Sequence, residues 1–400
     1  MKILFLCRDN PFVNSYGGAQ RTNLLYQALV QIAEVDIFCS FPYLTTGYFK
    51  QNNGAIIPYE EESFKAVKKL SNIQRHYQTI LHLFKSTQNY LGIEEPHQVK
   101  RIRSILKQNH YDYIVVRHVA TLSLCPYLDK SVIVDIDDMP EQILSIRIRE
   151  SEDSNRNWIQ QLSWNCYNAI EKKLVGYHTN RMVRKVKNVY IPDKKYYARY
   201  SNAIYLSNIP YPFSEVASTV TLPSPNEILF VGVLCYFPNC SGINHFLSSI
   251  WPIILQKNPE VHFNIVGSLT SVPDNDKRQW ENSKGVSLKG FVDNIAQEYA
   301  NSSVVVAPIF EGGGTNIKVL EAMQQGKACV ISMKASRGFE DLLMDGYNIM
   351  IAQNEQEFAD KVLQLLSDTQ LNQYLGANAK KTVQENFSFE SFTKAVHSAF

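Results

Sequence analysis

Short apolar runs alternate with helical patterns along the whole chain, and this alternation limits the possible folds more than any other feature. Ile3–Cys7 has the length and composition of a buried strand, and Ala19–Ile32 after it carries apolar residues at helical spacing. Further strands are expected at Val35–Cys39, Tyr113–Val116, Val132–Ile136, Ile228–Val233, Val261–Val266, Val286–Leu288, Val304–Ala307 and Ala328–Ile331. Strands that alternate with helices form parallel sheets covered by helices, so we expect an α/β protein.

The chain of 400 residues is too long for one ordinary core, and its sequence pattern changes between Ser207 and Pro225. There the helical pattern stops and prolines recur, which is typical of a linker. We therefore expect a domain over 1–206, a linker over 207–226 and a second domain over 227–386, with a final helical segment, 387–400, that could pack back on the first. Helices are expected at 64–85, 155–173, 243–256, 293–300, 316–325, 356–366, 371–384 and 389–399.

Composition excludes several functional classes. A formal net charge of +2 gives no reason to expect a nucleic-acid partner. The seven cysteines form no C-x-x-C pair and none has metal-ligand spacing with the histidines, so no metal is expected. The N-terminal apolar run is too short for a signal peptide, and no run is long enough to span a bilayer. We expect a cytoplasmic protein that is at most peripheral on a membrane.

The loop after the strand that ends at Pro308 gives the clearest indication of a ligand site. The strand that ends at Pro308 is followed by Gly312–Gly314, which lack Cβ atoms and let backbone approach a ligand closely. Thr315 is a good N-cap for the next helix, whose N-terminus favours an anion such as a diphosphate. Lys318 adds positive charge, and Glu321 lies on the same helical face. The alternative is a structural glycine loop in which Lys318 and Glu321 form a surface ion pair.

From about Ile228 to Ile351 the chain resembles the retaining family 4 (group 1) glycosyltransferases. The resemblance is carried by Gly312–Met323, which is similar to the branch motif G-G-G-T-R-x-K-x-L-E-A-M, and by Phe230–Gly232 with Pro238-Asn239, Phe263–Gly267 and Gly290–Asp293. It implies the GT-B fold, in which two Rossmann-like, doubly wound parallel-sheet domains face a central cleft. The first domain matches more thinly, through Gly17–Arg21 and Val134–Asp138.

The resemblance also implies site roles. Glu321 would bind the ribose hydroxyls of a UDP- or GDP-type donor, and Lys318 with Gly314-Thr315 would bind its diphosphate. Phe291 and Val292 would line the base pocket, while Gly17 and Gly18 would approach the donor from the first domain. The full set expected to contact the donor is Gly17, Gly18, Arg21, Phe291, Val292, Glu311, Gly313, Gly314, Thr315, Asn316, Lys318 and Glu321.

Three departures from the family pattern affect this site. Gly313 stands where many members have a glutamate, and Glu311 is the candidate substitute. Asn316 replaces the arginine of the branch motif, and Val231–Phe246 contains no Lys or Arg. Neutralisation of the leaving diphosphate would therefore depend on Lys318, with Arg337, Arg8 or Arg21 as possible helpers.

In the first domain, Arg8, Asp9, His118 and Asp137 all follow expected strands. His118 is a candidate to orient or deprotonate the acceptor hydroxyl, or else a structural histidine. Asp137 could contact a sugar, cap a loop or, with Asp135, form a metal-binding D-x-D. We expect His118, Asp137, Lys318 and Glu321 to carry the catalysis.

The stretch Arg181–Arg199 is strongly basic, which fits either a solvated face or contact with an anionic membrane or acceptor. The function expected from the whole chain is transfer of a sugar, with retention, from a nucleoside-diphosphate sugar to a glycan or lipid-linked hydroxyl in surface polysaccharide or lipopolysaccharide assembly, without metal or other cofactor. The alternatives are a sugar-nucleotide epimerase or phosphorylase of the same architecture, and a non-catalytic nucleotide-sugar-binding partner.

Overall fold

A computed structural model describes residues 1–12, 17–39, 54–57, 96–122, 124–125, 127–150, 157–211, 225–312 and 315–400. The chain divides into two units, which are treated separately. Unit 1 comprises Met1–Ser207 with Phe392–Phe400, and unit 2 comprises Asn208–Ser391. The helix expected at 64–85 and most of the expected linker lie outside the described residues. Among the described helices, none combines the length and the apolar character needed to cross a bilayer.

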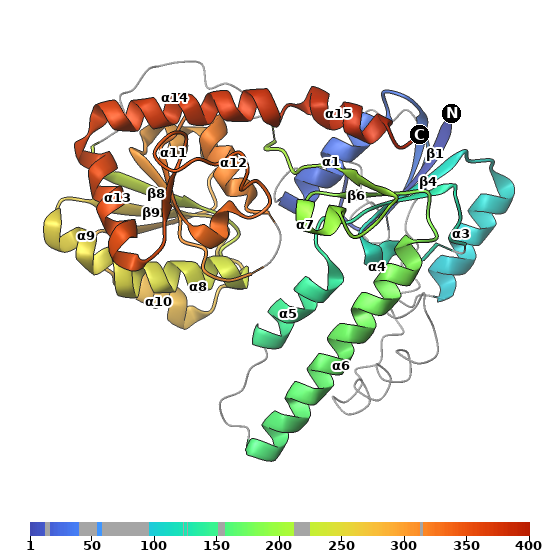
Figure 1. The fold of residues 1–400 in the computed structure, drawn as a ribbon, viewed down its shortest axis with the longest axis horizontal. Coiled ribbons are helices and arrows are strands. Elements are labelled where there is room, and N and C mark those ends of the chain that lie inside the picture. Colours follow the sequence, from blue (N-terminus) through green and yellow to red (C-terminus); the bar gives the residue numbers. More distant parts are fainter. Residues whose placement is uncertain are drawn as a thin grey trace. The chain divides into compact units, whose positions relative to one another are not determined.

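Unit 1 contains a parallel sheet of seven strands in the order β3-β2-β1-β4-β5-β6-β7 (Figure 1). Its strands are β1 Lys2–Cys7, β2 Glu34–Cys39, β3 Ile56–Ile57, β4 Tyr113–Arg117, β5 Val132–Asp135, β6 Asn188–Ile191 and β7 Ala203–Tyr205. Its helices are α1 Gly17–Leu29, α3 Pro96–Gln108, α4 Val119–Leu122, α5 Pro140–Glu150, α6 Trp158–Val183 and α7 Lys194–Tyr197. The order reverses between β1 and β4, which is the switch point of a Rossmann-like sheet.

The C-terminal residues of the chain belong to unit 1. Helix α15, Phe389–His397, ends beside β6, where the Tyr190 hydroxyl donates to the Val396 carbonyl at 2.6 Å. Lys187 Nζ donates to the Phe400 carbonyl at 3.0 Å, and the ring of Phe400 packs edge-on against Tyr113.

Unit 2 contains a parallel sheet of six strands in the order β10-β9-β8-β11-β12-β13. Its strands are β8 Glu227–Val231, β9 His262–Val266, β10 Val286–Gly290, β11 Val304–Ala307, β12 Cys329–Ser332 and β13 Met350–Ala352. Its helices are α8 Phe237–His245, a π-helix Phe246–Ile250, α9 Trp251–Lys257, α10 Asp274–Glu281, α11 Ile295–Asn301, α12 Ile317–Gln324, a 3-10 helix Met333–Ser336, α13 Glu355–Ser367 and α14 Thr369–Asn386. Figure 1 shows α8 and α10 on one side of this sheet and α12 and α14 on the other.

Several expected elements differ from those observed. The basic stretch was expected to be a solvated face or an anion-contacting surface, with no strand in it, but it contains β6 and α7, because Val189 and Ile191 are buried. Helix α6 extends ten residues beyond the expected end at 173. The helix expected from 243 begins at Phe237, where Pro238 near the N-terminus suits a helix start.

Candidate functional site

Lys318 and Glu321 lie at the carboxyl edge of the unit 2 sheet, on α12. The strand order reverses between β8 and β11, and the chain leaves β11 through the glycine loop into α12. This switch point is where open α/β sheets bind their ligands. Gly313 and Gly314 fall outside the described residues, whereas Gly312 is described and has a φ of 102°, a left-handed conformation that favours glycine.

Lys318 is held from the opposite side of the switch point by Asn239. Lys318 Nζ donates to Asn239 Oδ1 at 2.8 Å, and Asn239 Nδ2 donates to the Val233 carbonyl at 2.8 Å. A Cβ on Gly232 would lie 2.9 Å from that Asn239 amide and 3.2 Å from Lys318 Cε. Glycine at 232 is therefore what lets the lysine and the amide meet above the end of β8.

Burial lowers the pKa of Lys318 to about 8, and the charge of Glu321 offsets this only in part. Glu321 itself is buried, at 8% exposure. These two residues are therefore not the exposed surface ion pair that the structural alternative requires. Lys318 itself is half-buried, and a partly desolvated ammonium at a sheet edge is well suited to bind an anion, because the ligand's charge replaces the hydration that burial removes.

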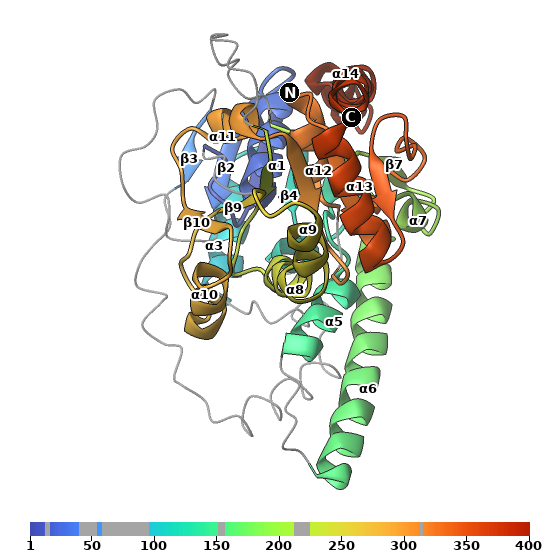
Figure 2. The same cartoon turned by 90° about the vertical axis from the view of Figure 1, so that its left-hand side faces the viewer.

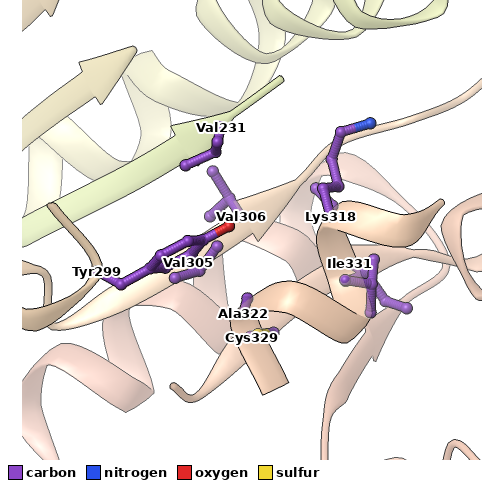
Figure 3. Close-up of a pocket in the computed structure, with 10 residues that line it drawn as sticks. Val231, Tyr299, Val305, Val306, Lys318, Ala322, Cys329 and Ile331 are labelled. Atoms are coloured by element: carbon purple, nitrogen blue, oxygen red, sulfur yellow. The ribbon is translucent and has the colours of Figure 1, made fainter. Parts of the chain in front are cut away.

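A small cavity of about 10 Å³ lies under Lys318, between α12 and strands β8, β11 and β12. In Figure 3 the Lys318 ammonium points away from the apolar lining residues Val231, Val306 and Ile331. A cavity of this size holds about one water, whereas small-molecule sites usually occupy about 300–1,000 Å³. The cavity is a packing feature and not a substrate site.

The start of α12 corrects one expectation. The N-cap residue is Asn316, not Thr315, and Asn316 makes no side-chain cap hydrogen bond. The Thr315 hydroxyl instead accepts a hydrogen bond from Asn208 Nδ2, and its methyl group occupies the space beside Gly338. Asn316 Nδ2 donates to the Ala335 carbonyl at 3.3 Å, so both side chains tie the loop to neighbouring segments.

Three other expected donor contacts occupy different environments within unit 2. Glu311 accepts from Ser241 Oγ at 3.2 Å, which connects the glycine loop to α8. Phe291 follows the end of β10 and is 70% exposed, and Val292 comes directly after it. Their roles in donor binding stay predictions.

In unit 1, a buried ion-pair network runs along the carboxyl ends of β4 and β5. Asp135 accepts from Arg21 through Nε at 3.0 Å and Nη2 at 2.6 Å, and Arg117 Nη1 lies 3.1 Å from Asp135 Oδ2. Arg117 Nη2 also pairs with Asp137 Oδ2 at 3.0 Å. The two acids of the D-x-D pattern therefore bind guanidinium groups.

Arg21 differs from the expected donor-binding residue. It is 3% exposed, and besides Asp135 it donates to the carbonyls of Leu206 and Ser207. These contacts hold the Arg21 side chain inside unit 1, and its role in donor binding stays a prediction. Gly17 and Gly18 form the first residues of α1, where the Gly18 carbonyl accepts from the Thr22 hydroxyl at 2.9 Å.

His118 lies at the outer end of this network, with Asp9. Arg117 Nη1 lies 3.3 Å from His118 Nδ1, and Arg117 is always protonated, so Nδ1 must accept. His118 Nε2 then carries the proton and donates to Asp9 Oδ2 at 3.0 Å. Burial, and then the charge of Arg117, lower the pKa of His118, so the imidazole is neutral at pH 7. With both nitrogens engaged, His118 is placed to hold Asp9 and not to act alone as a base.

The backbone of His118 is itself unusual. Its φ of 71° is left-handed, and its N–H donates to the Asp135 carbonyl at 2.9 Å. A left-handed non-glycine residue costs about 1–3 kcal/mol and is found most often at functional sites. Asp9 and Asn239 were visible in the sequence only as a polar residue after a strand and as part of a matching dipeptide.

Comparison with known proteins identifies a family likeness in the segment that carries these residues. Residues 225–368 match the family model for glycosyl transferases group 1. This segment therefore carries the likeness to group 1 glycosyltransferases. It includes Asn239, Lys318 and Glu321, and its bounds lie within unit 2.

Whole-length relatives extend the likeness to both units. An uncharacterized 44.6 kDa protein in the cps region of Klebsiella pneumoniae is 23% identical over 407 residues and covers 96% of both chains. A sucrose-phosphate synthase from Thermosynechococcus elongatus has a TM-score of 0.69 at 14% identity, over 99% of this chain and 97% of that one. Anabaena HepE, solved with UDP-glucose, has a TM-score of 0.61 at 14% identity, over 100% and 98%. The expected fold, with two parallel Rossmann-like domains of the GT-B class, is confirmed.

Proposed function

We propose that the protein transfers a hexose from a nucleoside-diphosphate sugar to a hydroxyl of a glycan or lipid-linked acceptor, with retention of configuration. The observation that carries the proposal is the half-buried Lys318 ammonium, fixed by Asn239 at the switch point of a segment that matches group 1 glycosyltransferases. Negative charge builds on the diphosphate as it leaves, and an ammonium already in place stabilises that charge without reorganisation.

Individual residues receive roles within this proposal. Lys318 and the N-terminus of α12 bind the diphosphate, and the buried Glu321 accepts hydrogen bonds from the ribose hydroxyls. Asp9, positioned by His118, and Asp137 contact acceptor or donor sugar from unit 1. The reaction needs no metal or other cofactor, and chelation with EDTA should leave it unchanged.

The cps-region relative supports a place in surface polysaccharide assembly, and the UDP-glucose complex of the structural neighbour supports a UDP-type donor. We place the reaction in the cytoplasm. A thermal-shift screen of UDP, GDP and other nucleoside diphosphates would identify the base, because a ligand of the native state raises the midpoint. Product linkage, determined by NMR, would then test retention.

The decisive experiment measures nucleoside-diphosphate release with a polysaccharide or lipid-linked acceptor fraction. Glu321→Gln and Lys318→Met should each reduce transfer about 100-fold or more. Lys327→Met is the matched control. Lys327 lies in the same matched segment and burial lowers its pKa to about 8, but its Nζ donates to the Ala300 and Ser302 carbonyls at the end of α11. Unchanged product with the Lys318 and Glu321 variants would favour the non-catalytic alternative, and an epimerised donor would favour an epimerase.

A further inference from the structure

Helix α6 has an apolar face that the rest of unit 1 does not bury. One side of the helix packs inward through residues such as Val175 and Met182. On another side, Ile159 and Leu162 are each 58% exposed, Ile170 is 56% exposed and Tyr177 is 60% exposed. With the exposed Cys166, these residues are spaced three, four, four and seven positions apart, which places them on one line along the helix. We name Ile159, Leu162, Cys166, Ile170 and Tyr177 the α6 stripe.

The α6 stripe gathers several exposed apolar side chains in one place, together with their neighbours. Trp158, the first residue of α6, is 75% exposed beside it, and Ile143 of the neighbouring α5 is 39% exposed. Single exposed apolar residues are ordinary, whereas a contiguous set marks a contact surface. In both Figure 1 and Figure 2 the N-terminal half of α6 extends away from the sheet of unit 1.

The line of the stripe continues into a basic hollow. Arg184 lies seven residues after Tyr177, two helical turns further along the same side of the helix. It lines a hollow of about 480 Å³ together with Lys130, Arg199, Tyr200, Ser201 and Asn202. Between residues 158 and 187 the chain has six Lys or Arg residues and one acid, Glu171. The surface therefore combines an apolar line with cationic charge.

We propose that the α6 stripe and the basic hollow dock the protein on an anionic phospholipid bilayer. A helix with large apolar residues and a tryptophan on one side, flanked by lysine and arginine, lies in the plane of the headgroups. Cations beside it are attracted to the surface potential of anionic lipid. A second copy of this chain fits less well, because pairing identical stripes would bring two sets of these cations together.

Vesicle binding tests this proposal without donor or acceptor, so its failure is independent of the proposed function. The full chain is mixed with phosphatidylcholine vesicles, with and without phosphatidylglycerol, and bound protein is separated by sedimentation. We expect binding to the anionic vesicles that weakens with added salt, with a blue shift in fluorescence. Trp158 and the half-buried Trp164 both lie on α6, whereas Trp251 and Trp280 are buried in unit 2. The shift is therefore followed in a Trp164→Phe background, where Trp158→Phe should remove most of it.

Ile159→Ser combined with Leu162→Ser should weaken binding about tenfold or more, and Arg184→Gln should reduce its salt dependence. Met344→Ser combined with Tyr374→Ser is the control, since these side chains are 53% and 51% exposed but lie on unit 2. Equal binding of the stripe variant and the control, or absence of binding by the wild type, would overturn the proposal. So would a dimer in light scattering that the stripe variant converts to monomer, or a Trp158 signal already blue-shifted without lipid.

Discussion

Replacing Lys318 by methionine should make the protein more stable at neutral pH and less active. Burial lowers the pKa of Lys318 from its ordinary 10.5 to about 8. That difference corresponds to ~3 kcal/mol of penalty on the ionised form in the native state. The substitution removes this penalty but leaves Asn239 Oδ1 without its donor, which costs about 1–3 kcal/mol. The expected net effect at pH 7 is therefore a stabilisation of about 0–2 kcal/mol.

The pH dependence gives the sharper test. The unfolded chain keeps the Lys318 proton up to its ordinary pKa, while the native chain releases it near pH 8. Between these values the unfolded state binds more protons, so the stability of the wild type rises with pH. The advantage of Lys318→Met should accordingly shrink by ~3 kcal/mol between pH 7 and 11 and reverse at the alkaline end.

Urea unfolding is measured in a Trp158→Phe, Trp164→Phe background, so that the fluorescence of the buried Trp251 and Trp280 reports on unit 2. Wild type and variant are compared at each pH so that titration of other groups cancels. Lys327→Met should show a shift of the same sign, since burial also lowers the pKa of Lys327 to about 8. Only Lys318→Met should also abolish binding of the donor nucleotide. A stability difference that does not change with pH would refute the argument that Lys318 is a buried cation.

Four further substitutions test other parts of the structure. Arg21→Met should lower the free energy of unfolding of unit 1 by about 3–5 kcal/mol, because it leaves the buried Asp135 carboxylate short of a partner; denaturant unfolding measures this. His118→Gly should be about 1 kcal/mol more stable than His118→Ala in thermal unfolding, since φ is 71° there. Gly176→Ala, on α6 with open space around the new Cβ, should raise stability by about 0.5–1 kcal/mol. Gly232→Ala should weaken donor nucleotide binding about tenfold or more in calorimetry, because the new Cβ would displace Lys318 and the Asn239 amide that holds it.

Each of these has a matched comparison. Arg21→Lys keeps one charge but loses the bidentate geometry, so it should fall between the wild type and Arg21→Met. Equal stability of His118→Gly and His118→Ala would mean that the left-handed backbone carries no strain. A destabilised Gly176→Ala would show that the Cβ is not accommodated. Gly232→Ala should lower the free energy of unfolding by no more than the about 1–3 kcal/mol that a lost donor to Asn239 costs, and a larger loss would mean that its effect on binding is not specific.

The sheet of unit 2 could be predicted from the sequence almost strand by strand. Runs such as Val304–Ala307 are buried on both faces, and a continuous apolar run needs no knowledge of its partner strands. β6 could not be found in the same way. Asn188–Ile191 is short and flanked by lysines, and its burial depends on the C-terminal residues 396–400, which meet it only in the folded chain.

The site residues also divide into those that local spacing predicts and those that it does not. Lys318 and Glu321 share one helical face with the glycine loop before them, so their proximity follows from local spacing. The partner of Lys318 is 79 residues away, and Arg21 pairs with an acid 114 residues away. No local pattern reports such pairs, which is why Arg21 was expected at the donor and found in the interior of unit 1.

The carboxyl edges of the two sheets differ in how their charged groups are balanced. In unit 2, one ammonium and one amide meet at the switch point above a glycine, and burial leaves the lysine poorly hydrated and ready for an anion. In unit 1, the corresponding edge carries guanidinium and carboxylate groups that already neutralise one another. An anion gains little from such an edge, whereas a neutral hydroxyl can still be oriented by Asp9, which His118 fixes in place. The charge balance of the two edges thus favours the diphosphate on unit 2 and an uncharged sugar on unit 1.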